Sequence, residues 1–416
     1  MALRKYRGGS DYNKTAMNSF VKADFRVSTG MPARMATEVE CRSVPIAWYV
    51  WTSVAATASA VFGLYWDISW HMSIGRDTFW TPAHLMIQFG AVLAGFCSAY
   101  LILRTTLWSQ AGDRSATVGI WGLRGPLGAF IAAWGGMTMV TSAPFDNWWH
   151  NAYGLDVTIV SPPHTVLLLG MIGIQVGGLV LVLGEMNRAP SAERGCLERI
   201  FLLSGGLILV QIAMFILEYS VLPRQHNAKF YLAVSIAIPL ILVGVARAAH
   251  HRWGSSIVAG VYTAFWLAML WIFPLFPATP KLGPVYQHVT HMVPLWFPLL
   301  LMVPAVALDL ARKQVKDSAK WWQGALLGAV FMVVFIAVQW PFAGFLQTPV
   351  AWGRVFGANY HEYAARPESF FIRHLFFAEE ATRSEFWGKM ALALICAMLS
   401  ARAGLAWGDW MRRIRR

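Results

Sequence analysis

Residues 45–103 read PIAWYVWTSVAATASAVFGLYWDISWHMSIGRDTFWTPAHLMIQFGAVLAGFCSAYLIL. Two apolar runs, 45–66 and 84–103, flank a polar stretch that carries aspartates and histidines. Each run can cross the hydrocarbon core of a bilayer as a helix, which takes about 20 residues. This stretch therefore predicts a helical hairpin in a membrane, with its polar turn at one face.

The turn of this hairpin recurs later in the chain. In both copies an aspartate, a histidine, a glycine and a second aspartate precede a hydroxyl residue, a proline and a second histidine. The copies are Asp67-x3-His71-x3-Gly75-x-Asp77 with Thr81-Pro82-Ala83-His84, and Asp146-x3-His150-x3-Gly154-x-Asp156 with Ser161-Pro162-Pro163-His164. The repeat predicts two structural units of the same local geometry.

The composition places these units in an integral membrane protein. Of the 416 residues, 57% are hydrophobic, 13% are charged and 21 are tryptophan, which is too apolar and aromatic for a soluble domain. The expected fold is all-α, a polytopic bundle of about ten transmembrane helices. The expected spans are 45–66, 84–103, 126–143, 165–184, 200–219, 230–246, 256–276, 292–308, 323–345 and 386–401.

The spans divide the chain into four parts. Residues 1–44 form a basic N-terminal tail, and residues 45–185 form a duplicated metal-binding module of four helices. Residues 186–321 add four membrane helices. Residues 322–416 supply two more, separated by an amphipathic segment at 346–385 and followed by a basic tail.

Charge predicts the orientation of these helices. The net charge is +13, and all but nine of the 34 Lys and Arg residues fall on one side of the expected layout. The positive-inside rule then places both termini in the cytoplasm and the motifs at the outer face of a bacterial-type inner membrane. This topology and the attraction of basic residues to anionic lipid explain the positive net charge. We therefore expect membrane lipid as a partner, and we expect no nucleic acid to bind.

In this layout most histidines lie on the same side of the membrane as the two motifs. Nine of the eleven fall at the outer face: His71, His84, His150, His164, His226, His288, His291, His361 and His374. The four cysteines are scattered without a CxxC pair, so neither a disulfide nor a thiolate metal site is expected.

The spacing within each copy indicates a metal site. An aspartate and a histidine four residues apart lie on one face of a helix, and the second histidine falls in the first turn of the next helix. Two imidazoles and one carboxylate suit copper, zinc or ferrous iron and leave coordination positions open. Asp77 and Asp156 are expected to hydrogen-bond the ligating imidazoles or to add a fourth ligand. The alternative is that all these side chains only cap helix ends.

Two further sets of residues are weaker candidates. His288 and His291 would share a helical face before the eighth span, as a further metal site or as an ordinary interfacial helix start. Glu218 is a candidate buried carboxylate for proton delivery or, in the alternative, a solvated residue at a helix end.

The first copy closely resembles a stretch in a known family. Its residues Asp67-Ile68-Ser69-Trp70-His71, Arg76-Asp77-Thr78 and Thr81-Pro82-Ala83-His84 are similar to the C subunit of the copper-dependent membrane monooxygenases, the particulate methane and ammonia monooxygenases. The spacing Asp-x3-His-x12-His is the same. A second family set, Asn-x3-His-x13-His, matches Asp146, His150 and His164 with Asp in place of Asn. The resemblance covers about residues 45–185, and the six later spans have no counterpart in that subunit.

The resemblance implies that Asp67, His71 and His84 bind one copper ion and that Asp146, His150 and His164 bind another. It further implies a monooxygenase-like oxidoreductase that acts on a small apolar substrate with oxygen. Other membrane subunits and an external electron donor would be its partners, and the resemblance identifies no catalytic residue. A non-enzymatic role in copper acquisition, transfer or assembly is the alternative function, and a module that has lost its metal is a third.

Overall fold

The computed structural model describes residues 46–75, 80–108, 116–154, 161–281, 289–315, 318–358, 360, 376 and 379–415. All of them belong to the compact unit Cys41–Arg416. The expected N-terminal tail and residues 359, 361–375 and 377–378 of the expected amphipathic segment 346–385 lie outside the described residues.

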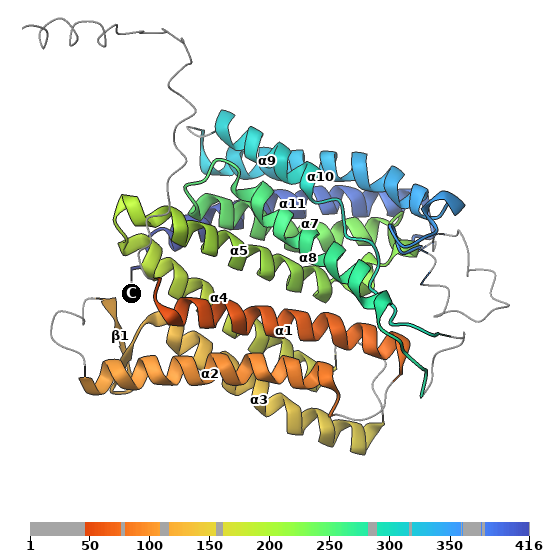
Figure 1. Cartoon of the computed structure of the whole chain (residues 1–416). Helices are drawn as coiled ribbons and strands as arrows, with labels where there is room; N and C mark the ends of the chain where they lie inside the picture. The colour runs from red at the N-terminus through yellow and green to blue at the C-terminus, as the bar shows by residue number, and fades with distance from the viewer. Residues whose placement is uncertain are drawn as a thin grey trace, which may run out of the picture. The chain divides into compact units, whose positions relative to one another are not determined.

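The described chain is predominantly helical (Figure 1). Its helices are α1 (Trp48–Ser73), α2 (Pro82–Trp108), α3 (Leu127–Tyr153), α4 (Pro162–Arg188), α5 (Ser191–Phe215), α6 (Leu217–Ser220), α7 (Ala228–Ala248), α8 (Gly254–Ile272), α9 (Met302–Gln314), α10 (Lys320–Leu346) and α11 (Arg383–Met411). Short 3-10 turns are η2 (Leu222–Arg224), η3 (Phe273–Leu275) and η4 (Pro349–Ala351). Between α2 and α3 lies a two-stranded hairpin that the sequence did not predict, of β1 (Val118–Ile120) and β2 (Leu123–Gly125).

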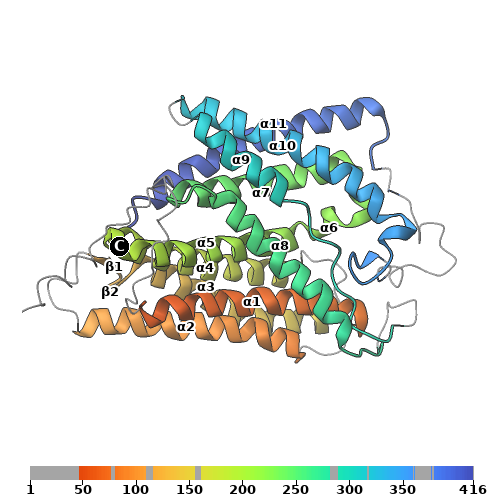
Figure 2. The same ribbon diagram turned by 45° about the horizontal axis from the view of Figure 1, so that its top comes forward.

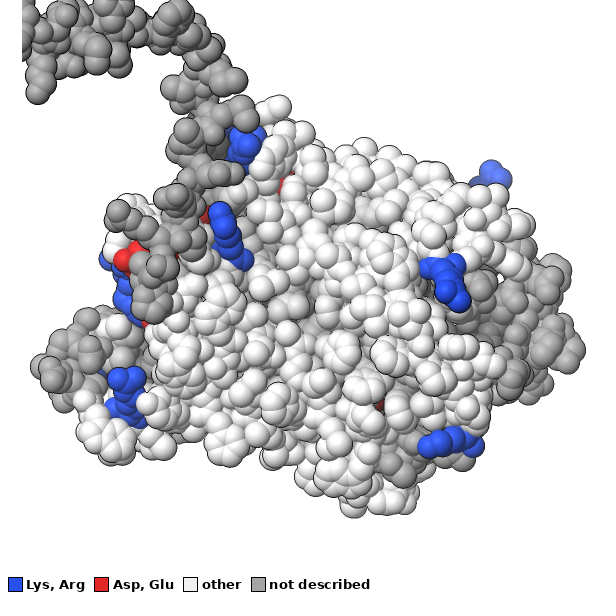
Figure 3. Space-filling view, viewed as in Figure 1, with Lys and Arg blue, Asp and Glu red and all other residues white. Residues whose placement is uncertain are grey.

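Seven of the described helices are long and apolar enough to cross a membrane, which confirms a multi-pass membrane protein. They are α2, α4, α5, α7, α8 extended by η3, α10 and α11. The face shown in Figure 3 is covered mainly by uncharged side chains, and Lys and Arg lie toward its two ends. Helices α1 and α3 have 26 and 27 residues but are not among these seven. The total of ten spans therefore stays a prediction.

The eighth expected span, 292–308, is wrong as a continuous helix. Residues 289–301 run without a regular helix, and α9 begins only at Met302. Pro294 and Pro298 explain the break, because proline lacks an N–H group and its ring clashes with the preceding helical turn. We call residues 289–301 the extended segment.

Side chains from other helices pair with the backbone of the extended segment. Leu295 N donates to the Tyr65 hydroxyl at 3.0 Å, and Leu299 N donates to the Tyr262 hydroxyl at 2.9 Å. Leu300 N donates to Oε1 of Gln339 at 2.9 Å. These bonds replace the helical ones that the prolines remove, because an unpaired N–H buried among apolar side chains is costly.

The first four helices pack as two hairpins in matching register. Helix α1 packs on α2 and α3 packs on α4, and the hairpins meet through the pairs α2–α3 and α1–α4 (Figure 1). A methyl group placed at Gly90 would lie 2.7 Å from Ala56 O. One placed at Gly170, at the equivalent position of the second hairpin, would lie 2.8 Å from Gly135 O. Small residues thus allow both pairs of backbones to approach closely at the same level.

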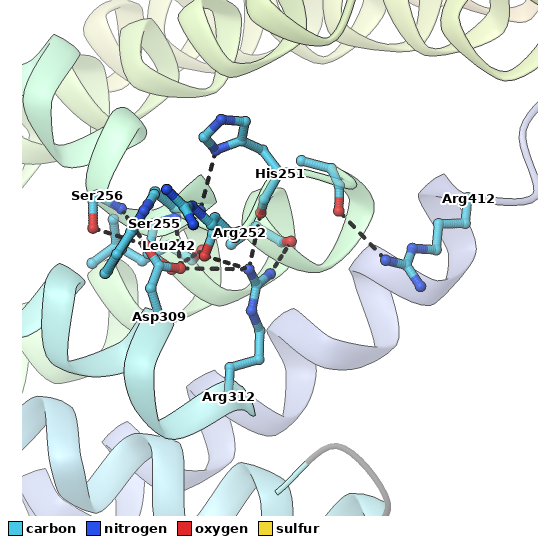
Figure 4. Close-up of polar contacts among 11 residues, drawn as sticks. Leu242, His251, Arg252, Ser255, Ser256, Asp309, Arg312 and Arg412 are labelled. Carbon is cyan, nitrogen blue, oxygen red and sulfur yellow. Dashed lines mark hydrogen bonds and ion pairs between the residues drawn. The ribbon is translucent and has the colours of Figure 1, made fainter. Parts of the chain in front are cut away.

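A buried aspartate fixes the start of α8. Asp309 of α9 is inaccessible to solvent and accepts hydrogen bonds from Ser255 N at 3.1 Å and from Ser256 N at 2.8 Å (Figure 4). These N–H groups belong to the first turn of α8, which has no helical partners for them. Arg312 lies 3.6 Å away and balances part of the charge. A carboxylate here also interacts favourably with the helix dipole.

We expect Gly135→Ala to destabilise the protein by about 1–3 kcal/mol, because the added methyl group overpacks the contact between α3 and α4. It would lie 2.4 Å from Ile174 N, a backbone atom that cannot move aside. Gly95→Ala is the control, since nothing lies within 4 Å of its added methyl group. Thermal unfolding in detergent measures both changes, and equal midpoints would contradict the tight packing.

We expect Asp309→Ala to cost about 1–3 kcal/mol of stability, because it leaves buried N–H groups of Ser255 and Ser256 without their acceptor. Asp309→Asn keeps one acceptor oxygen and should cost less. Thermal unfolding in detergent again gives the measurement. An Asp309→Ala protein as stable as wild type would show that this carboxylate does not hold the start of α8.

Candidate metal centre

The first copy of the motif forms a cluster at the end of α1. Oδ1 of Asp67 lies 3.5 Å from Nε2 of His71 and 3.1 Å from Nε2 of His84. Asp67 and His71 come from successive turns of α1, and His84 comes from the first turn of α2. The predicted convergence of these three side chains is therefore observed. We call them cluster 1.

The second copy forms the same arrangement between α3 and α4. Oδ1 of Asp146 lies 3.3 Å from Nε2 of His150 and 3.5 Å from Nε2 of His164. The two imidazole centroids are 6.4 Å apart and their planes meet at 64°, against 6.2 Å and 61° in the first cluster. We call this set cluster 2. The same spacing has thus produced nearly the same geometry twice.

Glycines end the two helices that carry the aspartates. Gly75 and Gly154 have φ of 93° and 88°, values that a residue with a Cβ adopts only with strain. Gly154 N donates to His150 O at 3.0 Å, so the glycine closes the last turn of α3. Helices α1 and α3 therefore end at Ser73 and Tyr153, just before these glycines, each of which lies four residues after the first histidine of its motif.

Capping residues begin the two return helices. His84 N donates to Oγ1 of Thr81 at 3.1 Å, and His164 N donates to Oγ of Ser161 at 3.4 Å. A proline occupies the first helical position in both. Together the cap and the proline set the direction in which each helix starts. This fixes the second imidazole of each cluster at a helix start.

The donor atoms of each cluster suit a metal ion. One ligand atom from each residue lies within 4.8 Å of the others, in both clusters. Oδ1 of Asp67 and Oδ1 of Asp146 are shielded from solvent, yet within the described chain neither accepts a hydrogen bond of good geometry. Each of these oxygens instead faces two imidazole nitrogens. A metal cation shared with the imidazoles would satisfy a shielded carboxylate oxygen in this position, as would a proton on a facing imidazole nitrogen.

The clusters lie near each other and are open to solvent in part. His164 is close enough to Asp67 to interact with it electrostatically, and α1 and α3 end at the same end of the bundle (Figure 1). Between 11% and 31% of each ligand side chain is exposed. A small ligand or a metal ion can therefore reach them.

Several of the histidines and aspartates singled out from the sequence are not among the described residues. Asp77, Asp156 and His288 lie outside the described residues, as do His361 and His374. The proposed roles of Asp77 and Asp156 stay predictions.

Two weaker candidates are corrected by the structure. His291 does not lie on a helix, because it forms an isolated β-bridge with Pro277 in the extended segment. Spacing along a helix therefore gives no reason to pair it with His288. Glu218 is exposed on the short helix α6, so it is not a buried carboxylate. The alternative interpretation of Glu218, a residue at an exposed helix end, agrees with the structure.

Two buried serines behind the first cluster were not predicted from the sequence. Ser69 and Ser73 lie on the face of α1 opposite the ligands and are fully buried. Oγ of Ser69 donates to Val293 O at 2.5 Å, and Val293 N donates to Oγ of Ser73 at 2.7 Å. Two serines spaced i, i+4 beside the ligands were the only local signal, and their partner is far away in the sequence.

Comparison with known proteins found no similarity: the chain matches no family model, no curated protein and no solved structure. Function is therefore inferred from the clusters themselves and from the resemblance of their motifs.

We expect Gly154→Ala to destabilise the protein by about 1–3 kcal/mol, because its backbone has φ 88° and ψ −179°, a conformation essentially restricted to glycine. Within the described part of the chain the added methyl group would meet no neighbour within 4 Å, so the effect isolates backbone strain. Gly344→Ala in α10 is the control, with equally open space and no positive φ. Thermal unfolding should separate the two variants, and equal stability would exclude strain at the end of α3.

Proposed function

We propose that each cluster binds one copper ion and that the protein is a monooxygenase-like oxidoreductase acting on a small apolar substrate with oxygen. The observation that carries the proposal is the repeated placement of one aspartate oxygen against two imidazole nitrogens. These donors alone would also suit zinc or ferrous iron. The resemblance to the C subunit of the copper-dependent membrane monooxygenases favours copper.

The side chains of each cluster have separable tasks in this proposal. Bound copper would supply one-electron redox chemistry toward dioxygen. The carboxylate of Asp67 or Asp146 offsets part of the positive charge of the ion and orients the two imidazoles, which bind in their neutral form. With three protein ligands, a position is left open for a small molecule.

Aromatic side chains lie next to the ligands of both clusters along α1 and α3. Trp66 and Trp70 lie beside the first, with ring centroids 6.4 Å apart. Phe145 stacks with Trp148 at 6.0 Å beside the second. An apolar surrounding of this kind strengthens electrostatic interactions inside a site and favours a small apolar substrate over a polar one.

The partial exposure of the ligands also favours a second candidate, a protein that acquires or transfers copper. An ion held by partly exposed side chains can be handed to another protein. An enzyme and a transfer protein differ in what the bound ion does: only the enzyme consumes dioxygen and oxidises a substrate.

We expect purified protein to contain two copper ions per chain after copper loading, measured by mass spectrometry of the metal. His71→Ala with His84→Ala should remove one ion, and His150→Ala with His164→Ala should remove the other. His250→Ala with His251→Ala is the matched control, since these histidines lie in neither cluster. Loss of no ion in either cluster variant would contradict the proposed sites.

The loaded protein then distinguishes the two functions. We expect reductant-dependent uptake of labelled dioxygen into a short alkane, abolished in the cluster variants and without oxygen. If both ions bind but no label is incorporated, and copper passes instead to an acceptor protein, the transfer function holds. Retention of zinc or iron in preference to copper would exclude both.

A further inference from the structure

The extended segment contacts α1 at the level of cluster 1. Oγ of Ser69 donates to Val293 O, Val293 N donates to Oγ of Ser73, and Oγ of Ser73 donates to Ser69 O at 2.6 Å. The peptide groups of Val293 are thus held by two serines that alternate along α1 with the ligands Asp67 and His71.

Further contacts secure the same part of α1 on both sides of the ligands. Leu295 N donates to the Tyr65 hydroxyl one half-turn before Asp67, and Lys281 N donates to Ile74 O at 2.8 Å, directly after the last turn. Phe273 of η3 packs on the Tyr65 ring at 5.3 Å, where α8 approaches α1 (Figure 2). The ligand-bearing turns of α1 are therefore fixed by the C-terminal half of the chain.

The equivalent positions around cluster 2 cannot make such contacts. Counting from the aspartates, Tyr65, Ser69 and Ser73 correspond to Pro144, Trp148 and Ala152. All three of these residues are exposed, and 54% of Trp148 is accessible. The described ring contacts of Trp148 are with residues of α3 itself. Two nearly identical donor sets thus stand in different surroundings.

Rigid surroundings raise metal affinity, because the protein then loses less conformational freedom when the ion binds. We infer that the extended segment acts as a strut that makes cluster 1 the tight, slowly exchanging metal site, whereas cluster 2 binds its ion more weakly and exchanges it readily. Ser69, Ser73 and Tyr65 are positioning residues in this arrangement. The inference rests on the proposed function, since it requires that both clusters bind a metal ion.

The test compares the clusters one at a time in the full-length protein. His150→Ala with His164→Ala leaves only cluster 1, and His71→Ala with His84→Ala leaves only cluster 2. Copper affinity is measured by competition with a chelator, and exchange is measured with a copper isotope. We expect cluster 1 to bind copper at least about 10-fold more tightly than cluster 2 and to exchange it more slowly. A difference in affinity of this size is typical of residues that support metal ligands.

The strut is tested by Ser69→Ala with Ser73→Ala in both backgrounds. We expect copper affinity to fall about 10- to 100-fold where only cluster 1 remains, and to stay unchanged where only cluster 2 remains. Ala152→Ser, at the exposed position equivalent to Ser73, is the matched control and should leave cluster 2 unchanged. In the Ser69→Ala with Ser73→Ala variant, the electron paramagnetic resonance signal of bound Cu(II) should become broader and more heterogeneous where only cluster 1 remains. The signal should stay unchanged where only cluster 2 remains.

Tyr65→Phe is the second variant if the double serine variant does not fold. It removes only the hydroxyl that accepts from Leu295 N and keeps the buried ring, so a smaller loss of affinity at cluster 1 is expected. Equal affinities of the two clusters, or equal losses in both backgrounds, would overturn the inference while the proposed function stands. A wild-type protein that binds no metal ion would overturn both.

Discussion

Every buried N–H and C=O group of this chain must find a partner inside the protein, and the architecture follows from that constraint. In apolar surroundings a helix satisfies its own backbone, which explains why long helices dominate the described chain. The exceptions are instructive because other side chains must replace the missing bonds. Residues 289–301 are not helical because they contain two prolines. Backbone N–H groups of this stretch donate hydrogen bonds to hydroxyl and amide oxygens of α1, α8 and α10.

The same constraint connects distant parts of the molecule. The Tyr262 hydroxyl, which accepts a hydrogen bond from Leu299 N, belongs to α8. The first turn of α8 is in turn bound by the buried Asp309. Helix α9, which carries Asp309, starts where the extended segment ends. A single irregular stretch therefore binds the C-terminal helices to one another and to the end of α1. Its polar contacts restrict the position of α1 more than apolar packing alone would do, because hydrogen bonds are directional.

Local features of this fold could be predicted from the sequence, and long-range ones could not. Apolar runs of bilayer length gave seven helices that the structure confirms as candidate spans. The convergence of Asp67 with His71 was predictable because residues four positions apart lie on the same face of a helix. The position of His84 was predictable because glycine ends α1, and threonine and proline begin α2. The break at Pro294 and Pro298 was missed because hydrophobicity alone suggested a span. The burial of Ser69 and Ser73 depends on Val293, a partner that no local pattern reveals.

The contact between the extended segment and α1 has a consequence for the order in which the protein matures. As the chain is synthesised, the ligands of both clusters emerge long before residues 289–301. All three ligands of cluster 2 are in place once α4 has been synthesised. Cluster 1 reaches its final form only after the C-terminal half has docked on Tyr65, Ser69 and Ser73. Cluster 1 thus needs residues from both halves of the chain to reach its final surroundings, whereas the ligands of cluster 2 come from α3 and α4 alone.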